Sequence, residues 1–170
     1  MSHVVTIVAA VPSTPKPPSE SFTEMVQVVL PNDANPMGFI LGGTVMHLAD
    51  IAGAIAAHRH TRTPMVTASV DGFQFLHPIR VGDLIILRAI VTATFRTSLE
   101  VEVEVLSEGV LTGERKLTSV AYLTFATMPR DGRREEVPEL LVDTDAEKTR
   151  AAAAADRRAI RLAARKRAMS

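Results

Sequence analysis

One carboxylate, Asp50, lies in an almost wholly apolar stretch that the sequence predicts as a helix, and two glycines, Gly42 and Gly43, precede it. Asp50 follows Gly43 by seven residues, close to two helical turns, so both face the same side of the helix. The first N–H groups of a helix have no partner within it, and they can stabilise a carbonyl oxygen as it becomes an oxyanion. With Asp50 as general base or nucleophile, this spacing favours attack on a polarised carbonyl group.

Asn35 precedes Pro36 in the loop before these glycines. Its amide can donate and accept hydrogen bonds, so it can orient a water molecule or hold a carbonyl oxygen. Simpler roles stay open for both polar residues. Asn-Pro is a common start of a turn, and an aspartate in an apolar helix can instead bind loop N–H groups or pair with a basic side chain.

The histidines offer a second kind of chemistry. His47 lies three residues before Asp50, and a His–carboxylate pair is what a hydratase or dehydratase would use. His58 and His60, near the end of the predicted helix, are expected to complement its dipole. His77 belongs to a loop and has no metal-ligand spacing to the others, and the chain has no cysteine. We therefore expect no metal site, no thiol nucleophile and no disulfide.

The elements that position these groups follow from the hydropathy pattern. Apolar and small residues cover almost every side of the helix predicted from Gly43 to about His58, so we expect it to be buried nearly all round. Residues 22–30 are strand-like, and four further β-rich segments follow Pro64, at 66–78, 82–95, 98–108 and 114–127. Long strands with short connections predict an antiparallel sheet, which can bury a single apolar helix by curling around it.

The remaining segments complete the predicted organisation. In 98–108, apolar residues alternate with Glu100, Glu102 and Glu104, so one face should be core and the other solvated. Residues 11–20 hold four prolines, which favours a flexible tail over residues 1–21. One domain is expected at 22–141, followed by a C-terminal helical extension at 142–170 whose helix begins near Asp145 and is exposed. The fold class is α+β, with an antiparallel sheet wrapped around one long buried central helix and an extra C-terminal helix.

Four segments in the same order resemble the hot-dog acyl-CoA thioesterases of the cytosolic acyl-CoA hydrolase type. They are NPMGFILGGTVMHLAD (35–50), VTASVDGFQFLHPIRVGD (66–83), TFRTSLEVEVEV (94–105) and LTFATMPRDGR (123–133). The resemblance covers about residues 22–141 and implies a hot-dog fold that pairs into dimers, with dimers assembling into hexamers. It also implies hydrolysis of acyl-CoA to free acid and CoA, with no metal or other cofactor.

The resemblance also implies roles for single residues. Asp50 matches the aspartate that acts as general base or nucleophile, and Asn35 matches an asparagine that works with it from the other subunit. Gly42 and Gly43 match the glycine pair at the start of the helix, with Gly38 upstream in the loop. A dimer with shared active sites is therefore expected, and a monomer should be inactive.

A neutral chain must bind the phosphates of CoA with a local group of cations. Arg96, Thr97 and Ser98 place a cation and two hydroxyls in one turn, which is a candidate phosphate clamp. In similar thioesterases this turn lies near the CoA entrance. The arginines of the final helix are expected mainly to form a solvated face, with a contact to CoA as the alternative for any one of them; they are Arg157, Arg158, Arg161 and Arg165.

The composition limits the partners. Lys+Arg 19 against Asp+Glu 19 leaves no overall charge to attract nucleic acid or membrane, and no apolar run reaches membrane-spanning length. We therefore expect a soluble cytoplasmic protein that binds acyl-CoA and its own copies. Two other functions stay open: a non-catalytic acyl-CoA sensor on the same fold, and a hot-dog hydratase or dehydratase that uses His47 with Asp50.

Overall fold

The β-rich segments form one antiparallel sheet in the computed structural model, which describes residues 14–130 and 133–168. The strands are β1 (Thr23–Val28), β2 (Met65–Phe75), β3 (Leu84–Phe95), β4 (Ser98–Glu108) and β5 (Arg115–Thr127). They lie in the order β1-β3-β4-β5-β2, so β1 and β2 are the edges. Two short strands of two residues each, β6 (Pro129–Arg130) and β7 (Arg133–Arg134), pair as a small hairpin. Two short 3-10 helices are η1 (Pro18–Ser21) and η2 (Pro31–Asp33).

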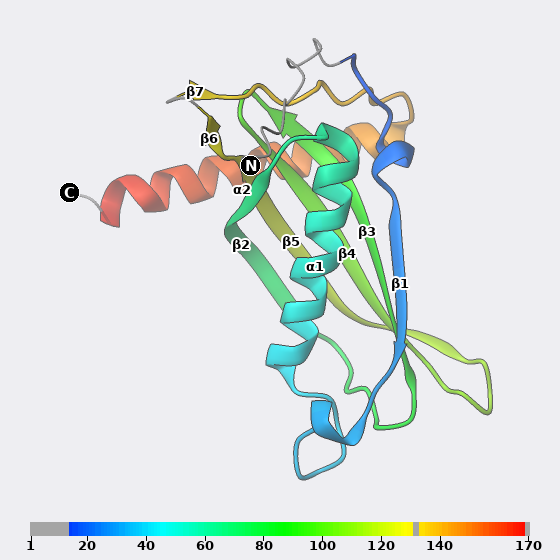
Figure 1. Cartoon of the computed structure of the whole chain (residues 1–170). Coiled ribbons are helices and arrows are strands. Elements are labelled where there is room, and N and C mark those ends of the chain that lie inside the picture. Colours follow the sequence, from blue (N-terminus) through cyan, green and yellow to red (C-terminus); the bar gives the residue numbers. More distant parts are fainter. Residues whose placement is uncertain (1–13, 131–132, 169–170) are drawn as a thin grey trace, which may run out of the picture.

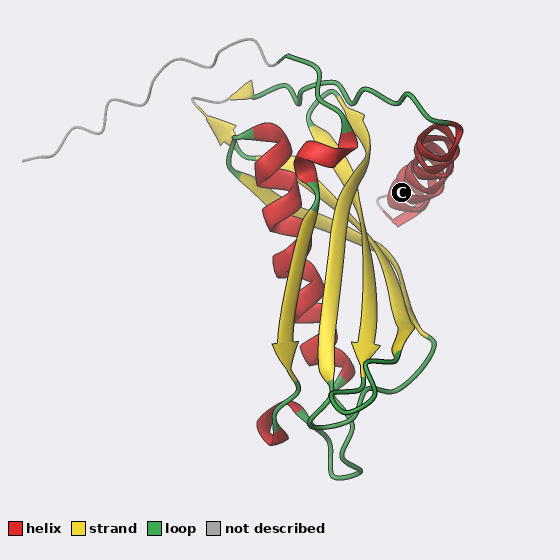
Figure 2. Ribbon diagram, turned by 90° about the vertical axis from the view of Figure 1, so that its right-hand side faces the viewer, coloured by secondary structure: helices red, strands yellow, loops and turns green. Residues whose placement is uncertain are grey.

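One long helix, α1 (Gly42–Thr61), lies against one face of the sheet, and a second, α2 (Asp145–Ala168), crosses the opposite face (Figures 1 and 2). The sheet curves around α1, and their facing side chains form the hydrophobic core. Val45, Leu48 and Ala52 from the helix meet Val101 and Phe125 from the sheet there. This arrangement is the hot-dog fold, so the predicted fold class is confirmed.

The close contact between α1 and the sheet depends on Gly53. A Cβ atom at this position would lie 3.1 Å from two ring carbons of Phe125, a buried core residue. The ring therefore packs directly on the helix backbone, where any larger side chain would push it away. The core is thin at this point because the helix contributes mostly alanine, as Ala49, Ala52 and Ala56 are all fully buried.

The prediction that α1 is buried nearly all round was wrong for the single chain. Met46 is 43% exposed, and Gly43 and His47 are also exposed, while Val45 and Leu48 are buried. The sheet covers only one side of the helix, so the side that carries Gly43 and His47 stays open in the chain on its own. Apolar surface left exposed by the described residues on that side is typical of a contact with another molecule.

The outer face of β4 was predicted to be solvated, and this was also wrong. Glu100 is 1% exposed and Glu102 is 9% exposed because α2 lies over them. Arg157 donates two hydrogen bonds to Glu100, at 3.0 and 2.7 Å, and its guanidinium lies 3.6 Å from the centre of the Tyr122 ring. Alternation shows which face is apolar, but it does not show that an arginine-rich helix will cover the polar one.

Two more contacts fix α2 on the sheet. Arg150 lies 3.5 Å from a carboxylate oxygen of Glu102, and Arg161 pairs with Asp71 of β2. The fully buried Ala154 lies between Arg150 and Arg157 on the same helix face, and its small side chain lets the two backbones approach. Burial of Glu102 raises the pKa of its carboxyl, an effect that the nearby Arg150 partly offsets.

The described end of the predicted N-terminal tail is packed against the domain. The Lys16 N–H donates to the carbonyl of Glu139, and its carbonyl accepts from Leu141 N–H, both at 2.9 Å. Ser21 is fully buried, and its hydroxyl accepts from the Val91 N–H at 2.9 Å. Residues 1–13 of that segment and the last two residues of the extension lie outside the described residues. Neither described helix is long and apolar enough to cross a membrane.

His60, near the end of α1, is not the charged dipole partner that the sequence suggested. It is fully buried, its Nε2 lies 3.0 Å from the carbonyl oxygen of Pro138, and its Nδ1 has no partner among the described residues. Burial lowers the pKa of the His60 imidazole from its usual value of 6.5, although the bond to Pro138 opposes this. Folding therefore favours the neutral form of the His60 imidazole over the protonated form.

We expect the free energy of unfolding to fall as the pH drops below about 6.5, because the unfolded chain then binds a proton at His60 more readily than the folded chain. Between the pKa of His60 in the unfolded chain and its lower pKa in the folded chain, the free energy of unfolding falls by up to about 1.4 kcal/mol per pH unit. Below the folded-state pKa, His60 causes no further loss. Urea unfolding across this range should show a weaker pH dependence in His60→Gln, which keeps an amide donor for Pro138. The exposed His47→Gln is the control, and an unchanged pH dependence in His60→Gln would contradict the assignment.

Candidate functional site

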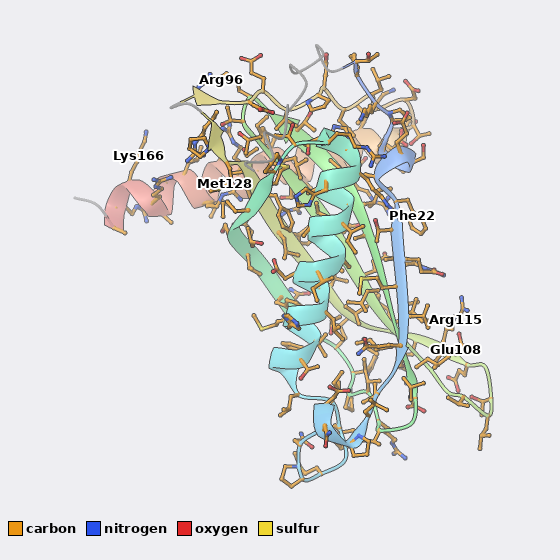
Figure 3. The ribbon with its side chains drawn as sticks, viewed as in Figure 1. Phe22, Arg96, Glu108, Arg115, Met128 and Lys166 are labelled. Carbon is orange, nitrogen blue, oxygen red and sulfur yellow. The ribbon has the colours of Figure 1, made fainter. Side chains whose placement is uncertain are left out.

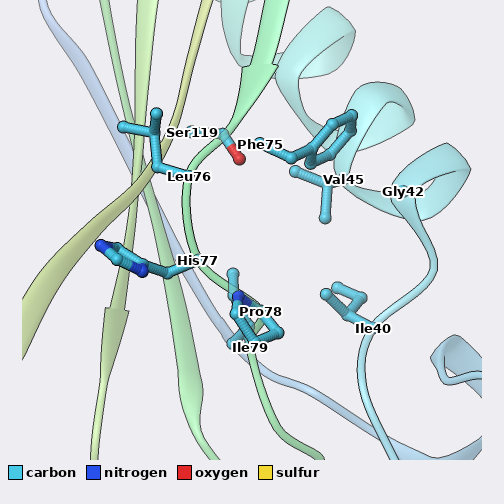
Figure 4. Close-up of a pocket in the computed structure, with 9 residues that line it drawn as sticks. All are labelled: Ile40, Gly42, Val45, Phe75, Leu76, His77, Pro78, Ile79 and Ser119. Atoms are coloured by element: carbon cyan, nitrogen blue, oxygen red, sulfur yellow. The ribbon is translucent and has the colours of Figure 1, made fainter. Parts of the chain in front are cut away.

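The N-terminus of α1 borders a cavity. The helix begins at Gly42 after an extended Leu41, and no side chain of the described residues caps its first turn. The cavity has a volume of about 350 Å³ and a mainly apolar lining (Figure 4). The lining residues are Ile40, Gly42, Val45, Phe75, Leu76, His77, Pro78, Ile79 and Ser119. An apolar cavity beside uncapped helix N–H groups can hold an acyl group with its carbonyl oxygen at the helix end.

The two glycines have different surroundings. A Cβ atom at Gly42 would lie 3.3 Å from the ring of Phe75, whereas one at Gly43 would meet open space. Phe75 in turn stacks on Phe73, with ring centres 4.8 Å apart. Gly42 thus lets an aromatic wall of the cavity approach the first turn of α1, and Gly43 leaves the next position of that turn accessible.

Asp50 is half-buried and bonded to β2. The Thr67 hydroxyl donates to Asp50 Oδ1 at 2.6 Å, and Thr67 is the hydrogen-bond partner of Asp50 in the described part of the chain. Asp50 therefore neither binds loop N–H groups nor pairs with a basic residue here. Thr67 is not recognisable as a site residue from the sequence, because a threonine in a β-rich segment carries no signal of its contact with a helix residue 17 positions earlier.

Asp50 lies on the same helix face as the glycines, but it is too far from them for both to act on one reacting group within a single chain. It follows Gly42 by eight residues, which corresponds to about 12 Å along the helix axis. A single reacting carbonyl cannot contact both the first turn and this carboxylate in one chain. His47 is exposed and shares no hydrogen bond with Asp50, so the His–Asp pair that a hydratase would need is not formed between these two described residues.

Asn35 shapes the loop before α1. Its Oδ1 accepts hydrogen bonds from the N–H groups of Met37 at 3.0 Å and Phe39 at 3.2 Å, so the turn role suggested by Asn-Pro is present. Gly38 completes the turn at φ +80°, a conformation that favours glycine. These bonds leave the Asn35 amide nitrogen as a donor for other groups. Asn35 and Asp50 share no hydrogen bond within the chain.

The candidate CoA clamp lies at the opposite end of the sheet from the glycines (Figure 3). The backbone carbonyl of Arg96 accepts from Val137 N–H, and that of Thr97 accepts from Thr127 N–H, each at 3.0 Å. Thr127 pairs with Met65, which follows the C-terminal end of α1. Because a helix of 20 residues spans about 30 Å, the structure does not bring Arg96, Thr97 and Ser98 to the glycine end of the same chain.

Three of the four C-terminal arginines contact the sheet. Arg157 and Arg161 are paired with Glu100 and Asp71, and Arg158 lies 4.3 Å from the centre of the Phe95 ring. The expectation of a solvated arginine face was therefore wrong for these residues; Arg165 is exposed. Among residues 14–130 and 133–168, no three histidine, aspartate or glutamate side chains are grouped to hold a metal ion.

Comparison with known proteins decides the family. Residues 37–114 match the family model of the thioesterase superfamily. An uncharacterised acyl-CoA thioester hydrolase of Bacillus subtilis is 38% identical over 119 residues, which make up 70% of this chain and 69% of that protein. The chain belongs to the thioesterase superfamily. Its human relative, a cytosolic acyl coenzyme A thioester hydrolase, is 35% identical over 80% of this chain, but the match spans only 37% of that longer protein.

Solved structures agree with this thioesterase-superfamily membership. An acyl-CoA hydrolase of Staphylococcus aureus, solved with butyryl coenzyme A and coenzyme A, is 33% identical with a TM-score of 0.83, over 91% of this chain and 94% of that chain. A hexameric acyl-CoA thioesterase is 38% identical with the same TM-score, over 91% and 97%. Structures of the S. aureus enzyme also exist for alanine variants of an aspartate, an asparagine and a threonine.

Proposed function

We propose that this chain is an acyl-CoA thioesterase, which hydrolyses the thioester of fatty acyl-CoA to free acid and CoA. The observation that carries the proposal is the Asp50–Thr67 hydrogen bond, on the open face of a helix whose first turn borders an apolar cavity. Membership of a family of acyl-CoA thioester hydrolases supports it. The proposed reaction requires a carboxylate, water and N–H donors, and no cofactor beyond the CoA of the substrate.

In the proposed mechanism, Asp50 acts as general base on a water molecule or attacks the thioester carbon itself. The Thr67 hydroxyl holds one carboxylate oxygen, which fixes the orientation of the group. The other oxygen faces the reacting atoms. First-turn N–H groups near Gly42 and Gly43 stabilise the oxyanion. The C–S bond then breaks, and the CoA thiolate takes a proton, which in the general-base route is the proton that Asp50 removed from water. In the direct route, water hydrolyses the resulting anhydride, which releases the acid, restores Asp50 and supplies the proton for the thiolate.

We infer that the N–H donors at each Asp50 come from a second copy of the chain. The strand β2 is an edge of the sheet, and its exposed apolar residues Val66, Val70 and Phe75 are 44%, 46% and 52% exposed. Two-fold pairing of this edge with its copy would run the two strands, and the two α1 helices, in opposite directions. The partner's glycine end and Asn35 loop would then approach Asp50. Asp50 would thus meet the glycines of the partner's helix, and the distance of about 12 Å from the glycines of its own helix would not matter.

Three residues of this chain have the same separations as the three variant sites of the S. aureus enzyme. Asn35 and Asp50 are 15 residues apart, and Asp50 and Thr67 are 17 apart, as are the asparagine, aspartate and threonine replaced there. This agreement supports a joint role for the three residues here. Self-association is supported by relatives that are hexameric, and for this chain we propose a trimer of dimers.

The same two-fold arrangement supports the predicted contacts with CoA. Reversal of the second chain brings its glycine end toward the end of the sheet at which Arg96 lies. Arg96 is exposed, and with Thr97 and Ser98 it can bind the phosphates of a CoA whose thioester lies at Asp50. Gly38 holds the partner's loop in the conformation that presents Asn35.

We expect two inactive variants to restore activity when they are combined. Asn35→Asp keeps the Oδ1 bonds that shape the loop but removes the amide donor, and Asp50→Asn removes the base. In a shared site, a mixed dimer holds one intact site, so equal co-expression should give about a quarter of the wild-type rate of CoA release. Each variant alone and the wild type are the controls. A co-expressed mixture as inactive as its components would contradict the shared site.

A further inference from the structure

The strand that carries Thr67 is irregular at this residue. The β2–β5 register shifts between Thr67 and Ser69, and again between Val70 and Gly72. Thr67 is opposite Phe125 and Ser69 is opposite Thr124, so Ala68 is an extra residue on β2. A bulge of this kind changes the face to which the following side chains point. Thr67 therefore faces α1 and Asp50, whereas the Ser69 hydroxyl lies on the other face of the sheet, with Asp71.

Asp71 joins the two bulges on the outer face. The Ser69 hydroxyl donates to its Oδ1 at 2.7 Å, the Thr124 hydroxyl donates to its Oδ2 at 3.0 Å, and Arg161 of α2 pairs with the same Oδ2. The Asp71 side chain is 8% exposed and that of Arg161 is 19% exposed. The Asp71 carboxylate, four residues after Thr67, thus contacts a second residue of β2, a residue of β5 and a residue of α2.

We propose that Asp71 and Arg161 are positioning residues for the Asp50–Thr67 pair. This inference rests on the proposed function, and it gives a role to the C-terminal helix α2, which lies on the opposite face of the sheet from α1, the helix that carries Asp50 (Figure 2).

The physical reason is the register of an edge strand. Among the described strands, β2 pairs with β5 alone, and a slip by one residue would turn Thr67 away from Asp50. The Asp71 carboxylate holds the residues after the bulge at their places on β5, and the ion pair with Arg161 offsets the cost of burying this carboxylate. Misplacing a catalytic group by about 1 Å can lower a rate by about 10²-fold, so a loosened bulge has a measurable cost.

The test compares Arg161→Met with Arg150→Met, a matched control that removes an ion pair between the same helix and Glu102 of β4. We expect Arg161→Met to lower kcat at least about tenfold with little change in KM, and Arg150→Met to leave both unchanged. Arg161→Lys, which keeps the charge, should recover part of the loss. In a Thr67→Val background, Arg161→Met should cause little further loss, because its effect passes through Thr67.

Two results would overturn the inference while the proposed function stands. One is a normal kcat in Arg161→Met; the other is the same fold-loss in the Thr67→Val background as in the wild type. Amide hydrogen exchange tests whether Arg161 holds β2 in place by a measurement that does not depend on catalytic activity. Arg161→Met should speed exchange of the β2 amides around residues 67–71 at least about tenfold relative to those of β4. Unchanged β2 exchange would refute the positioning role of Asp71 and Arg161, whereas a wild type that binds but does not hydrolyse acyl-CoA would refute only the proposed function.

Discussion

Replacing Asp50 by asparagine is expected to lower kcat for acyl-CoA hydrolysis by about 10²–10⁴-fold, the usual contribution of a positioned general base. Asparagine has the same size and can still accept the hydrogen bond that the Thr67 hydroxyl donates at 2.6 Å. It can neither take a proton from water nor attack a thioester effectively. The variant should therefore fold, assemble and bind acyl-CoA as the wild type does, so that the loss appears in kcat and not in binding.

The measurement is CoA release from short, medium and long acyl-CoAs, with binding followed in parallel by calorimetry. His47→Gln is the control, because this exposed side chain lies on the same helix face, three residues away. An Asp50→Asn variant with near wild-type kcat would contradict the catalytic role. Tight binding of acyl-CoA by a wild type that releases no CoA would instead favour the non-catalytic sensor.

Replacing Arg157 by alanine is expected to lower the free energy of unfolding by about 3–5 kcal/mol, the usual cost of removing one partner from a buried ion pair. Glu100 is 1% exposed, and without Arg157 its carboxylate keeps the hydrogen bond from the Thr92 hydroxyl at 2.9 Å as its remaining side-chain contact among the described residues. The lost contact between the guanidinium and the Tyr122 ring adds to the effect. Urea unfolding of the whole chain measures the change.

A second variant separates the buried charge from simple loss of packing. Combining Arg157→Met with Glu100→Gln removes both charges and keeps similar volumes, so it should be markedly more stable than Arg157→Ala. If the single variant loses less than about 1 kcal/mol, the pair is no more important than a surface salt bridge. That result would mean that water reaches Glu100 beneath α2.

The strands were the most predictable part of the fold. The strand β4 has the predicted bounds, Ser98–Glu108, because strict alternation of apolar residues and glutamates has a single structural period. The helix α1 was found but ends at Thr61, later than predicted, because His60 is buried against Pro138 and continues the helix as a core residue. A histidine in a sequence does not show whether it faces water or the core.

Contacts between distant segments were the least predictable. Nothing in the glutamates of β4 indicates that α2 covers them, and nothing in Thr67 indicates its bond to Asp50. For the site, the apolar setting of Asp50 and the glycine start of α1 could be inferred from residue types. The roles of Asn35 and Asp50 came from resemblance and stay predictions. The separation of Asp50 from the glycines is implied by the sequence, because it follows from the rise of the helix alone.

The attachment of α2 has a consequence for how many positions this helix can occupy. Apolar surfaces slide past one another at little cost, whereas charge pairs are directional. Arg150, Arg157 and Arg161 follow one another at seven and four residues, so they share a helix face, and each meets a different carboxylate. A shift of α2 by one residue would rotate this face by about 100° and separate all three pairs together. The three ion pairs can therefore form together in only one placement of α2 on the sheet.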